Sequence, residues 1–214
     1  MLKPKSHFYF IHVIVFVIFV ACLLMNGPMR GGLPLDNELP ERIQFILENT
    51  ALWQLSWCIW MLAALGLYSF CTLFAMKIEK GLYRTLGLSF VAMGIVPDTM
   101  AEVIYAFVIP KSAMAGASMA LLGVLETSAM HLTGFLGNGL YNLGALVLTL
   151  GAWRQSILSL PMFTFGLLAW LLGLALSASI ALGSTKGAEI FTALSMVTST
   201  LWMLAFAYIG TRGD

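Results

Sequence analysis

The sequence has few charged residues. Only 10% of its 214 residues are Asp, Glu, Lys or Arg, whereas 60% are hydrophobic. The mean hydropathy is +0.91. A water-soluble domain carries about 25% charged residues, so a chain this apolar has too little polar surface to face water. The charges also cluster and leave uncharged runs of about 20 residues, which is the length that crosses a bilayer. The composition therefore predicts an all-α polytopic transmembrane bundle.

Features that mark several functional classes are also missing. The net charge is +1, which gives no reason to expect nucleic acid as a partner. Three cysteines, Cys22, Cys58 and Cys71, lie in apolar runs without a CxxC pair, so buried free thiols are expected. No Walker, GxSxG or HExxH motif occurs. We therefore expect no cofactor, and an enzyme is the less favoured class.

Histidine is equally scarce. The three residues are His7, His12 and His131, and the first two lie at the start of the first apolar run, far from the third. Zinc requires three or four converging ligands. No metal site is predicted.

Six apolar segments are long enough to span a membrane, and together they make one domain, 1–214. Residues 26–50 contain three Pro, three Gly and mixed charges, which predicts an outer loop. Pro110 is expected to end the third helix. Residues 112–124 either form a short interfacial helix or extend the fourth span, and a seven-span alternative crosses the membrane at 112–132. The six predicted helices are about 8–25, 51–75, 85–109, 125–152, 158–183 and 188–210.

Six spans place both termini on one side of the membrane. Seven basic residues are then on that side and four on the other, which is the bias of a cytoplasmic side. Both termini are therefore expected in the cytoplasm. The first group is Lys3, Lys5, Lys77, Lys80, Arg84, Arg154 and Arg212, and the second is Arg30, Arg42, Lys111 and Lys186.

Three tryptophans, Trp53, Trp57 and Trp60, share a helix face near the outer loop. Tryptophan is enriched at the membrane interface, so an interfacial anchor is expected. The alternative is a surface on which a ligand stacks.

Two acidic residues interrupt the third span. Asp98 lies near its middle and Glu102 one turn further, so both carboxyls lie on one helix face. A charged side chain at the bilayer centre costs roughly 2.5–3.5 kcal/mol on insertion scales, and neighbouring like charges repel. At least one is expected to bind a proton or to find a partner. Packing against neighbouring helices is the alternative.

The fourth span carries a polar stripe beside a glycine stripe. Thr127, His131, Asn138 and Asn142 recur at intervals of four, seven and four. Gly137, Gly144 and Gly151 recur every seven residues and predict a close helix contact. Asn138, Asn142 and the hydroxyl of Tyr141 are expected to form hydrogen bonds across that contact.

His131 is the residue of this stripe whose charge can change near neutral pH. If the third and fourth spans are antiparallel neighbours, His131 lies level with Glu102, and Glu126 lies further out. A contact between His131 and Glu102, as an ion pair or a proton relay, is therefore predicted.

Three motifs, LWQLSW (52–57), PDTMAEVIY (97–105) and HLTGFLGNGLYNLGALVLTL (131–150), follow an N-terminal helix and an outer loop. In these features the chain resembles a loose group of small bacterial multipass membrane proteins of unknown function. The resemblance implies six spans in a bacterial cytoplasmic (inner) membrane and no known activity.

Two functional hypotheses follow. In the first, Asp98, Glu102, His131 and Glu126 serve a polar pocket between the third and fourth helices that binds or transports a proton, a cation or a small amphiphile. In the second, the chain is a non-catalytic accessory or assembly subunit. The expected partners are the lipid bilayer, a small-molecule or ion ligand, and a membrane protein or a second copy of the chain.

Overall fold

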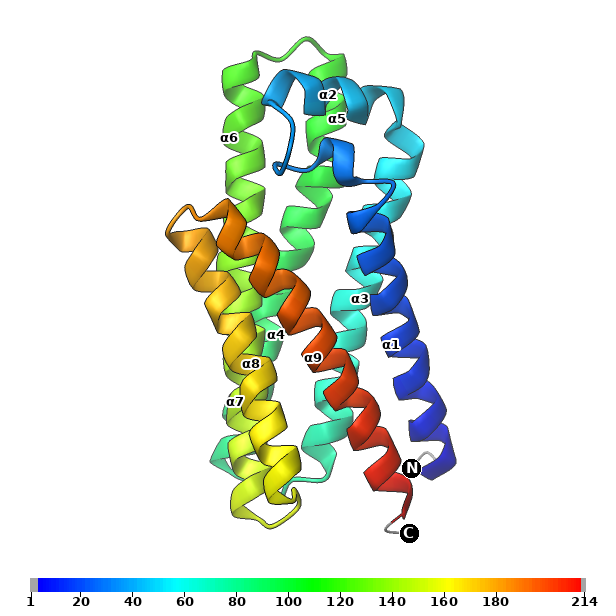
Figure 1. The fold of residues 1–214 in the computed structure, drawn as a ribbon, viewed down its shortest axis with the longest axis vertical. Coiled ribbons are helices and arrows are strands. Elements are labelled where there is room, and N and C mark those ends of the chain that lie inside the picture. The colour runs from blue at the N-terminus through cyan, green and yellow to red at the C-terminus, as the bar shows by residue number, and fades with distance from the viewer. Residues whose placement is uncertain (1–3, 213–214) are drawn as a thin grey trace.

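The computed structural model describes residues 4–212, with side chains described for residues 7–208. All regular secondary structure in this range is helical, and the long helices pack into one bundle (Figure 1). Six helices are long and apolar enough to cross a membrane. They are His7–Asn26, Thr50–Met76, Leu82–Met114, Met119–Arg154, Leu160–Ala181 and Thr185–Tyr208. The prediction of an all-α, multi-pass protein with six spans is confirmed.

Four of the spans are single helices and two are composite. The single helices are α1 (Pro4–Asn26), α3 (Thr50–Met76), α8 (Leu160–Ala181) and α9 (Thr185–Arg212). The third span runs through α4 (Leu82–Val103), the π-helix η2 (Ile104–Val108) and α5 (Ile109–Met114). The fourth runs through α6 (Met119–Met130), the π-helix η3 (His131–Gly137) and α7 (Asn138–Arg154). Between α1 and α3 lie the 3-10 turn η1 (Arg30–Gly32) and α2 (Leu39–Glu48).

One predicted boundary was wrong. Pro110 does not end the third span, because the helix continues to Met114. The π-helix η2 ends two residues before this proline, and local π-adjustment is one way in which a membrane helix accommodates the missing N–H. Of the alternatives for residues 112–124, the structure agrees with an extension of the fourth span, because Ser118 caps α6 and this span begins at Met119. A turn around Gly116 (φ +79°) separates α5 from α6, and the described residues contain six candidate spans, not seven.

The composite spans project beyond their neighbours. Leu82–Met114 has 33 residues and is about 50 Å long at 1.5 Å per residue, whereas a hydrocarbon core is about 30 Å thick. Their α5 and α6 ends extend past the α8–α9 turn, and α2 packs across them (Figure 1). We call this the loop end. At the opposite, terminal end, α1 begins where α9 finishes, and the rings of Phe8 and Tyr208 are 5.2 Å apart.

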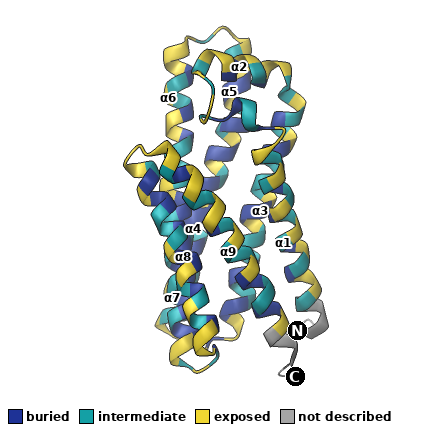
Figure 2. Cartoon of the chain, viewed as in Figure 1, coloured by how far each residue is buried: buried dark blue, intermediate teal, exposed yellow. Residues whose placement is uncertain are grey.

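The bundle is tightly filled near the terminal end. Phe70, Phe74, Trp202 and Phe206 are buried and pack edge-to-face or stacked, with ring centroids 5.0–6.4 Å apart. Burial is highest inside the bundle, and exposed positions lie on its outer surface (Figure 2). Many exposed side chains are large and apolar, as at the lipid-facing positions of a membrane bundle.

The glycines of the fourth span lie against α4. A Cβ added at Gly144 would lie 2.5 Å from the carbonyl oxygen of Gly87, and one at Gly94 would lie 2.7 Å from that of Gly137. Gly151 packs in the same way on Tyr83. The two backbones therefore approach each other so closely that no side chain fits between them.

We predict that Gly144→Ala lowers the free energy of unfolding by about 1–3 kcal/mol, the usual cost of adding a methyl group to a filled interior. Thermal unfolding in lipid nanodiscs measures the change. Gly81→Ala is the matched control, because a Cβ there meets nothing within 4 Å and the backbone is extended. Equal stability of the two variants would contradict the close contact.

Candidate functional site

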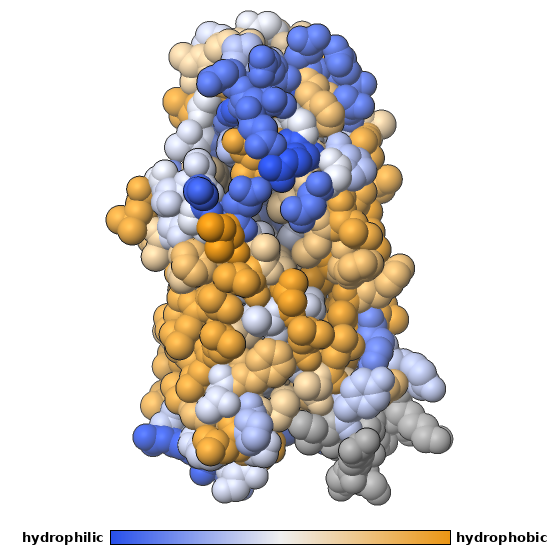
Figure 3. Space-filling model, viewed as in Figure 1, coloured by the Kyte–Doolittle hydropathy of each residue, from blue (hydrophilic) through white to orange (hydrophobic). Residues whose placement is uncertain are grey.

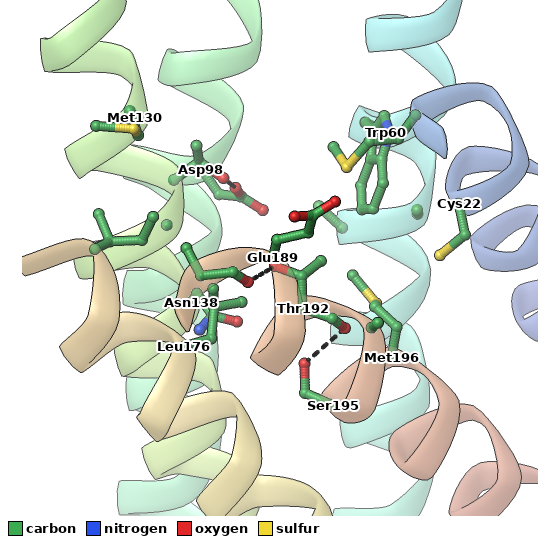
Figure 4. A pocket seen from close by; sticks show the side chains of 18 of the residues that line it. Cys22, Trp60, Asp98, Met130, Asn138, Leu176, Glu189, Thr192, Ser195 and Met196 are labelled. Atoms are coloured by element: carbon green, nitrogen blue, oxygen red, sulfur yellow. Dashed lines mark hydrogen bonds between the residues drawn. The ribbon is translucent and has the colours of Figure 1, made fainter. Parts of the chain in front are cut away.

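A cavity of about 570 Å³ lies inside the loop-end half of the bundle. Side chains from α1, α3, α4, η3, α7, α8 and α9 line it, together with Leu33, Pro34 and Leu35 of the segment after η1. Most of the wall is apolar, and its polar side chains come from several helices, among them Asp98 of α4, Asn138 of α7 and Glu189 of α9 (Figure 4). The predicted pocket between the third and fourth helices is thus one wall of a larger cavity.

Both acidic residues of α4 line this cavity. Asp98 is 5% exposed and Glu102 is 2% exposed. The hydroxyl of Thr133 on η3 donates a hydrogen bond to Asp98 Oδ1. Glu102 Oε2 is buried and has no hydrogen-bond partner among the described residues. Since a buried unpartnered acceptor costs about 1–3 kcal/mol, Glu102 requires a group that this part of the chain does not supply.

Asp98 lies at the middle of the third span, as predicted, because it is residue 17 of the 33 in Leu82–Met114. Thr133 contacts Asp98, and the adjacent Gly134 packs against Ile180 in the last turn of α8. Asp98 is therefore also level with the loop-end limit of α8. The two levels coincide because the third span extends beyond α8 at the loop end.

Aromatic side chains border the carboxyls. Trp57 stacks on Tyr105 with ring centroids 4.5 Å apart and planes 4° from parallel. Trp53 is 1% exposed, and its indole N–H donates a 2.8 Å hydrogen bond to the Tyr105 carbonyl in η2. Trp57 is 4% exposed. The prediction of interfacial anchors was wrong for these two tryptophans, because that face of α3 packs against the third span.

The indole N–H groups of Trp57 and Trp60 are buried and without a hydrogen-bond partner among the described residues. Both tryptophans line the cavity with Tyr105. Unpartnered donors and the unpartnered acceptor of Glu102 therefore line the same cavity. The ring faces also favour a cation, because the π-system of an aromatic ring attracts positive charge.

The asparagines of α7 reach α8. The side-chain amide of Asn138 donates to the Gly173 carbonyl (2.7 Å) and to Ser177 Oγ (2.8 Å), and Asn142 donates to Asn138 Oδ1 (2.9 Å). The bonds of Asn138 join α7 to α8 and not, as predicted, to the helix across the glycine contact, whereas the Asn142 bond lies within α7. Asn138, Tyr141 and Asn142 also line the cavity.

His131 lies elsewhere. Its Nδ1 is 2.8 Å from the Thr127 carbonyl, and both residues border a separate surface hollow on α6. Within residues 7–208 no hydrogen bond or ion pair joins His131 to Glu102, so the structure does not bring the predicted pair together. The π-helix η3 is the reason. A π-helix turns the chain by a smaller angle per residue than an α-helix, so residues after it leave the face on which His131 lies.

Glu126 is not part of the cavity either. It forms a buried ion pair with Arg42 of α2, whose Nε donates to Glu126 Oε1 (3.0 Å) and whose Nη2 contacts Oε2. Arg42 also donates to the Asn37 carbonyl. The ion pair fastens α2 to α6 at the loop end. The sequence indicates Arg42 only by its place in a short amphipathic helix, and that place does not identify the partner.

A second ionic contact lies at the rim of the cavity. Arg30 donates to Asp36 (2.8 Å) and to Glu189 of α9 (3.3 Å), and these hydrogen bonds raise the pKa of its guanidinium. Glu189 lines the cavity (Figure 4). From the sequence, Trp57 and Trp60 were expected at a ligand only as the alternative to an interfacial anchor. Thr133 and Glu189 were not expected at the site, because these residues converge only through helix packing.

The two carboxyls make this part of the cavity electrostatically favourable for a positive charge. Two buried carboxyls one turn apart repel each other when both are ionised, and a positive charge between them relieves that repulsion. No group of three or more His, Cys, Asp or Glu within residues 7–208 is arranged to hold a metal ion. The apolar walls fit a carbon-rich molecule, and pockets of about 300–1,000 Å³ suit small organic ligands.

No protein-family model, curated protein or solved structure matches this chain.

We predict that Arg42→Met lowers the free energy of unfolding by about 3–5 kcal/mol, because it leaves the Glu126 carboxylate buried without a partner. The double variant Arg42→Met, Glu126→Leu should recover most of the loss, since no buried charge remains. Thermal unfolding in nanodiscs measures both. Arg30→Gln is the control, because Arg30 is solvent-exposed and its removal should change stability far less. If Arg42→Met were as stable as the double variant, the stabilising role of Arg42 beside Glu126 would be contradicted.

Proposed function

We propose that the chain binds a small amphiphile with a basic amine head in the cavity of the loop-end half. The observation that carries the proposal is Glu102, a buried carboxyl without a partner beside Asp98, at the polar end of an apolar cavity. An ammonium group donates several hydrogen bonds and carries the charge that the paired carboxyls favour. An apolar tail fits against the remaining walls.

The tryptophans of α3 support the same head group. Trp57, Trp60 and Tyr105 border the space beside the carboxyls, and a cation over an indole or phenol ring gains about 0.5–2 kcal/mol. The unpartnered indole N–H groups favour an additional oxygen acceptor near the amine. An amino alcohol or an amine with a carbonyl oxygen would satisfy both needs.

The proposed state opens toward the loop end. The aromatic cluster of Phe70, Phe74, Trp202 and Phe206 fills the bundle on the terminal side of the cavity. The ligand therefore does not exchange through the terminal side in this state. Transport across the bilayer requires this cluster to separate, which makes binding the simpler function of the observed arrangement.

We also propose a membrane and an orientation for the protein. The basic residues expected at the terminal end outnumber those at the loop end, which favours a cytoplasmic location of both termini. The resemblance to small bacterial multipass proteins favours the inner membrane. The cavity would then open away from the cytoplasm.

We predict that octylamine raises the thermal unfolding temperature of the protein in nanodiscs, whereas octanol, of similar length but uncharged, does not. Binding at 100 times Kd stabilises a folded protein by about 2.7 kcal/mol. Asp98→Asn and Glu102→Gln should each weaken octylamine binding roughly tenfold or more, because a hydrogen bond to a charged group contributes about 1.5–3 kcal/mol.

Two controls separate binding from folding. Glu79→Gln removes an exposed carboxyl that does not line the cavity and should retain the octylamine effect. His131→Ala should retain it as well, because His131 borders another hollow. Stabilisation by octanol equal to that by octylamine would refute the proposal. Loss of folding in Glu102→Gln, without an octylamine effect on the wild type, would favour the accessory or assembly role.

A further inference from the structure

A gap separates α1 from α9 on one side of the bundle. The two helices meet at the terminal end, where Phe8 and His12 pack on Tyr208 with ring centroids 5.2 and 5.9 Å apart. Toward the loop end α9 crosses the bundle diagonally and moves away from α1 (Figure 1). The gap is therefore closed at the terminal end and widest near the α8–α9 turn.

The cavity reaches this gap. Ile18 and Cys22 of α1 line it, and so do Ala193, Met196 and Val197 of α9. Val197 is 58% exposed, and Ala193 is also exposed, so the lining of the cavity continues onto the outer surface of the bundle. The cavity therefore opens laterally between α1 and α9, which are both long and apolar enough to span a membrane.

The surface around the gap changes polarity along the bundle. In the space-filling view a hollow lies below a group of hydrophilic side chains, and mainly hydrophobic side chains surround its lower part (Figure 3). Arg30 contacts both Asp36 and Glu189 above the gap. Leu33, Pro34 and Leu35 lie on the cavity side of this segment. At the loop end, the Arg30–Glu189 contact thus lies at the rim of the cavity, whereas apolar side chains line the lateral opening.

We propose that the ligand is a single-chain, lipid-like amine that enters from the bilayer between α1 and α9. Its amine passes under the Arg30–Glu189 contact to Asp98 and Glu102, and its alkyl chain lies in the apolar part of the cavity beside Met196. A molecule dissolved in the membrane meets apolar side chains throughout this path and keeps its amine at the level of the membrane surface. This inference rests on the proposed function. It adds that the ligand comes from the bilayer and that it carries a long alkyl chain.

The reactivity of the native Cys22 thiol reports whether a ligand occupies the cavity. It lines the cavity, whereas Cys58 does not line it and Cys71 is buried in the core, so Cys58→Ser with Cys71→Ala leaves one informative thiol. The full chain is reconstituted in vesicles, and alkylation of Cys22 by N-ethylmaleimide is followed by mass spectrometry. Dodecylamine should slow the alkylation, whereas ethylamine, which has the same head but no long tail, should not.

The route is tested by narrowing the gap. Val197→Phe should slow the onset of protection by dodecylamine on the order of tenfold, which corresponds to about 1.4 kcal/mol in the barrier. The final extent of protection should remain unchanged, because Val197 lies at the edge of the opening. Leu201→Phe is the matched control, since Leu201 is equally exposed on α9, one turn closer to the terminal end, and does not line the cavity.

The outcomes distinguish the inference from the function on which it rests. Equal protection by ethylamine and dodecylamine, or an unchanged rate in Val197→Phe, overturns the lateral route. The proposed function then still stands if Glu102→Gln abolishes protection, and the ligand enters past Arg30. If Glu102→Gln retains full protection by dodecylamine, the carboxyls do not bind the amine and both proposals are overturned.

Discussion

The close contact between α4 and α7 is the constraint on which the site depends. Gly87 and Gly94 of α4 meet Gly144 and Gly137 of the fourth span at distances that exclude any side chain. In a membrane, helices gain little from burying apolar surface, and small residues allow the backbone packing that holds them together. This contact sets α4 beside η3. The carboxyl of Asp98 can therefore reach Thr133, and one wall of the cavity is formed.

The two π-helices influence which side chains of the third and fourth spans face the cavity. Both lie toward the loop end, η2 directly after Glu102 and η3 beside Asp98. The change in helical phase at η3 turns Asn138 toward α8 and leaves His131 on another surface. At η2, the indole N–H of Trp53 donates a hydrogen bond to the Tyr105 carbonyl. π-Segments within α-helices are frequent at functional sites, which agrees with their place beside the carboxyls.

Much of the site chemistry could be predicted from local sequence. Asp98 and Glu102 are four residues apart in an apolar span, so their shared face and their cost in a membrane follow from helical geometry. The glycines at intervals of seven likewise indicated a close contact. The same reasoning failed for His131, because it assumed an uninterrupted α-helix. It failed for Glu126 because the partner, Arg42, lies 84 residues away on a different helix.

The six spans, the glycine contact and the pair of acids in the third span follow from the sequence, since each depends on composition or on spacing within one helix. Which polar groups share a cavity depends instead on the packing of the helices. The unpartnered oxygen of Glu102, the indoles of Trp57 and Trp60, and the opening beside Val197 are brought together by the crossing of several helices. Residue spacing within a single helix carries no information about such crossings, because their angles depend on how side chains from different helices fit together.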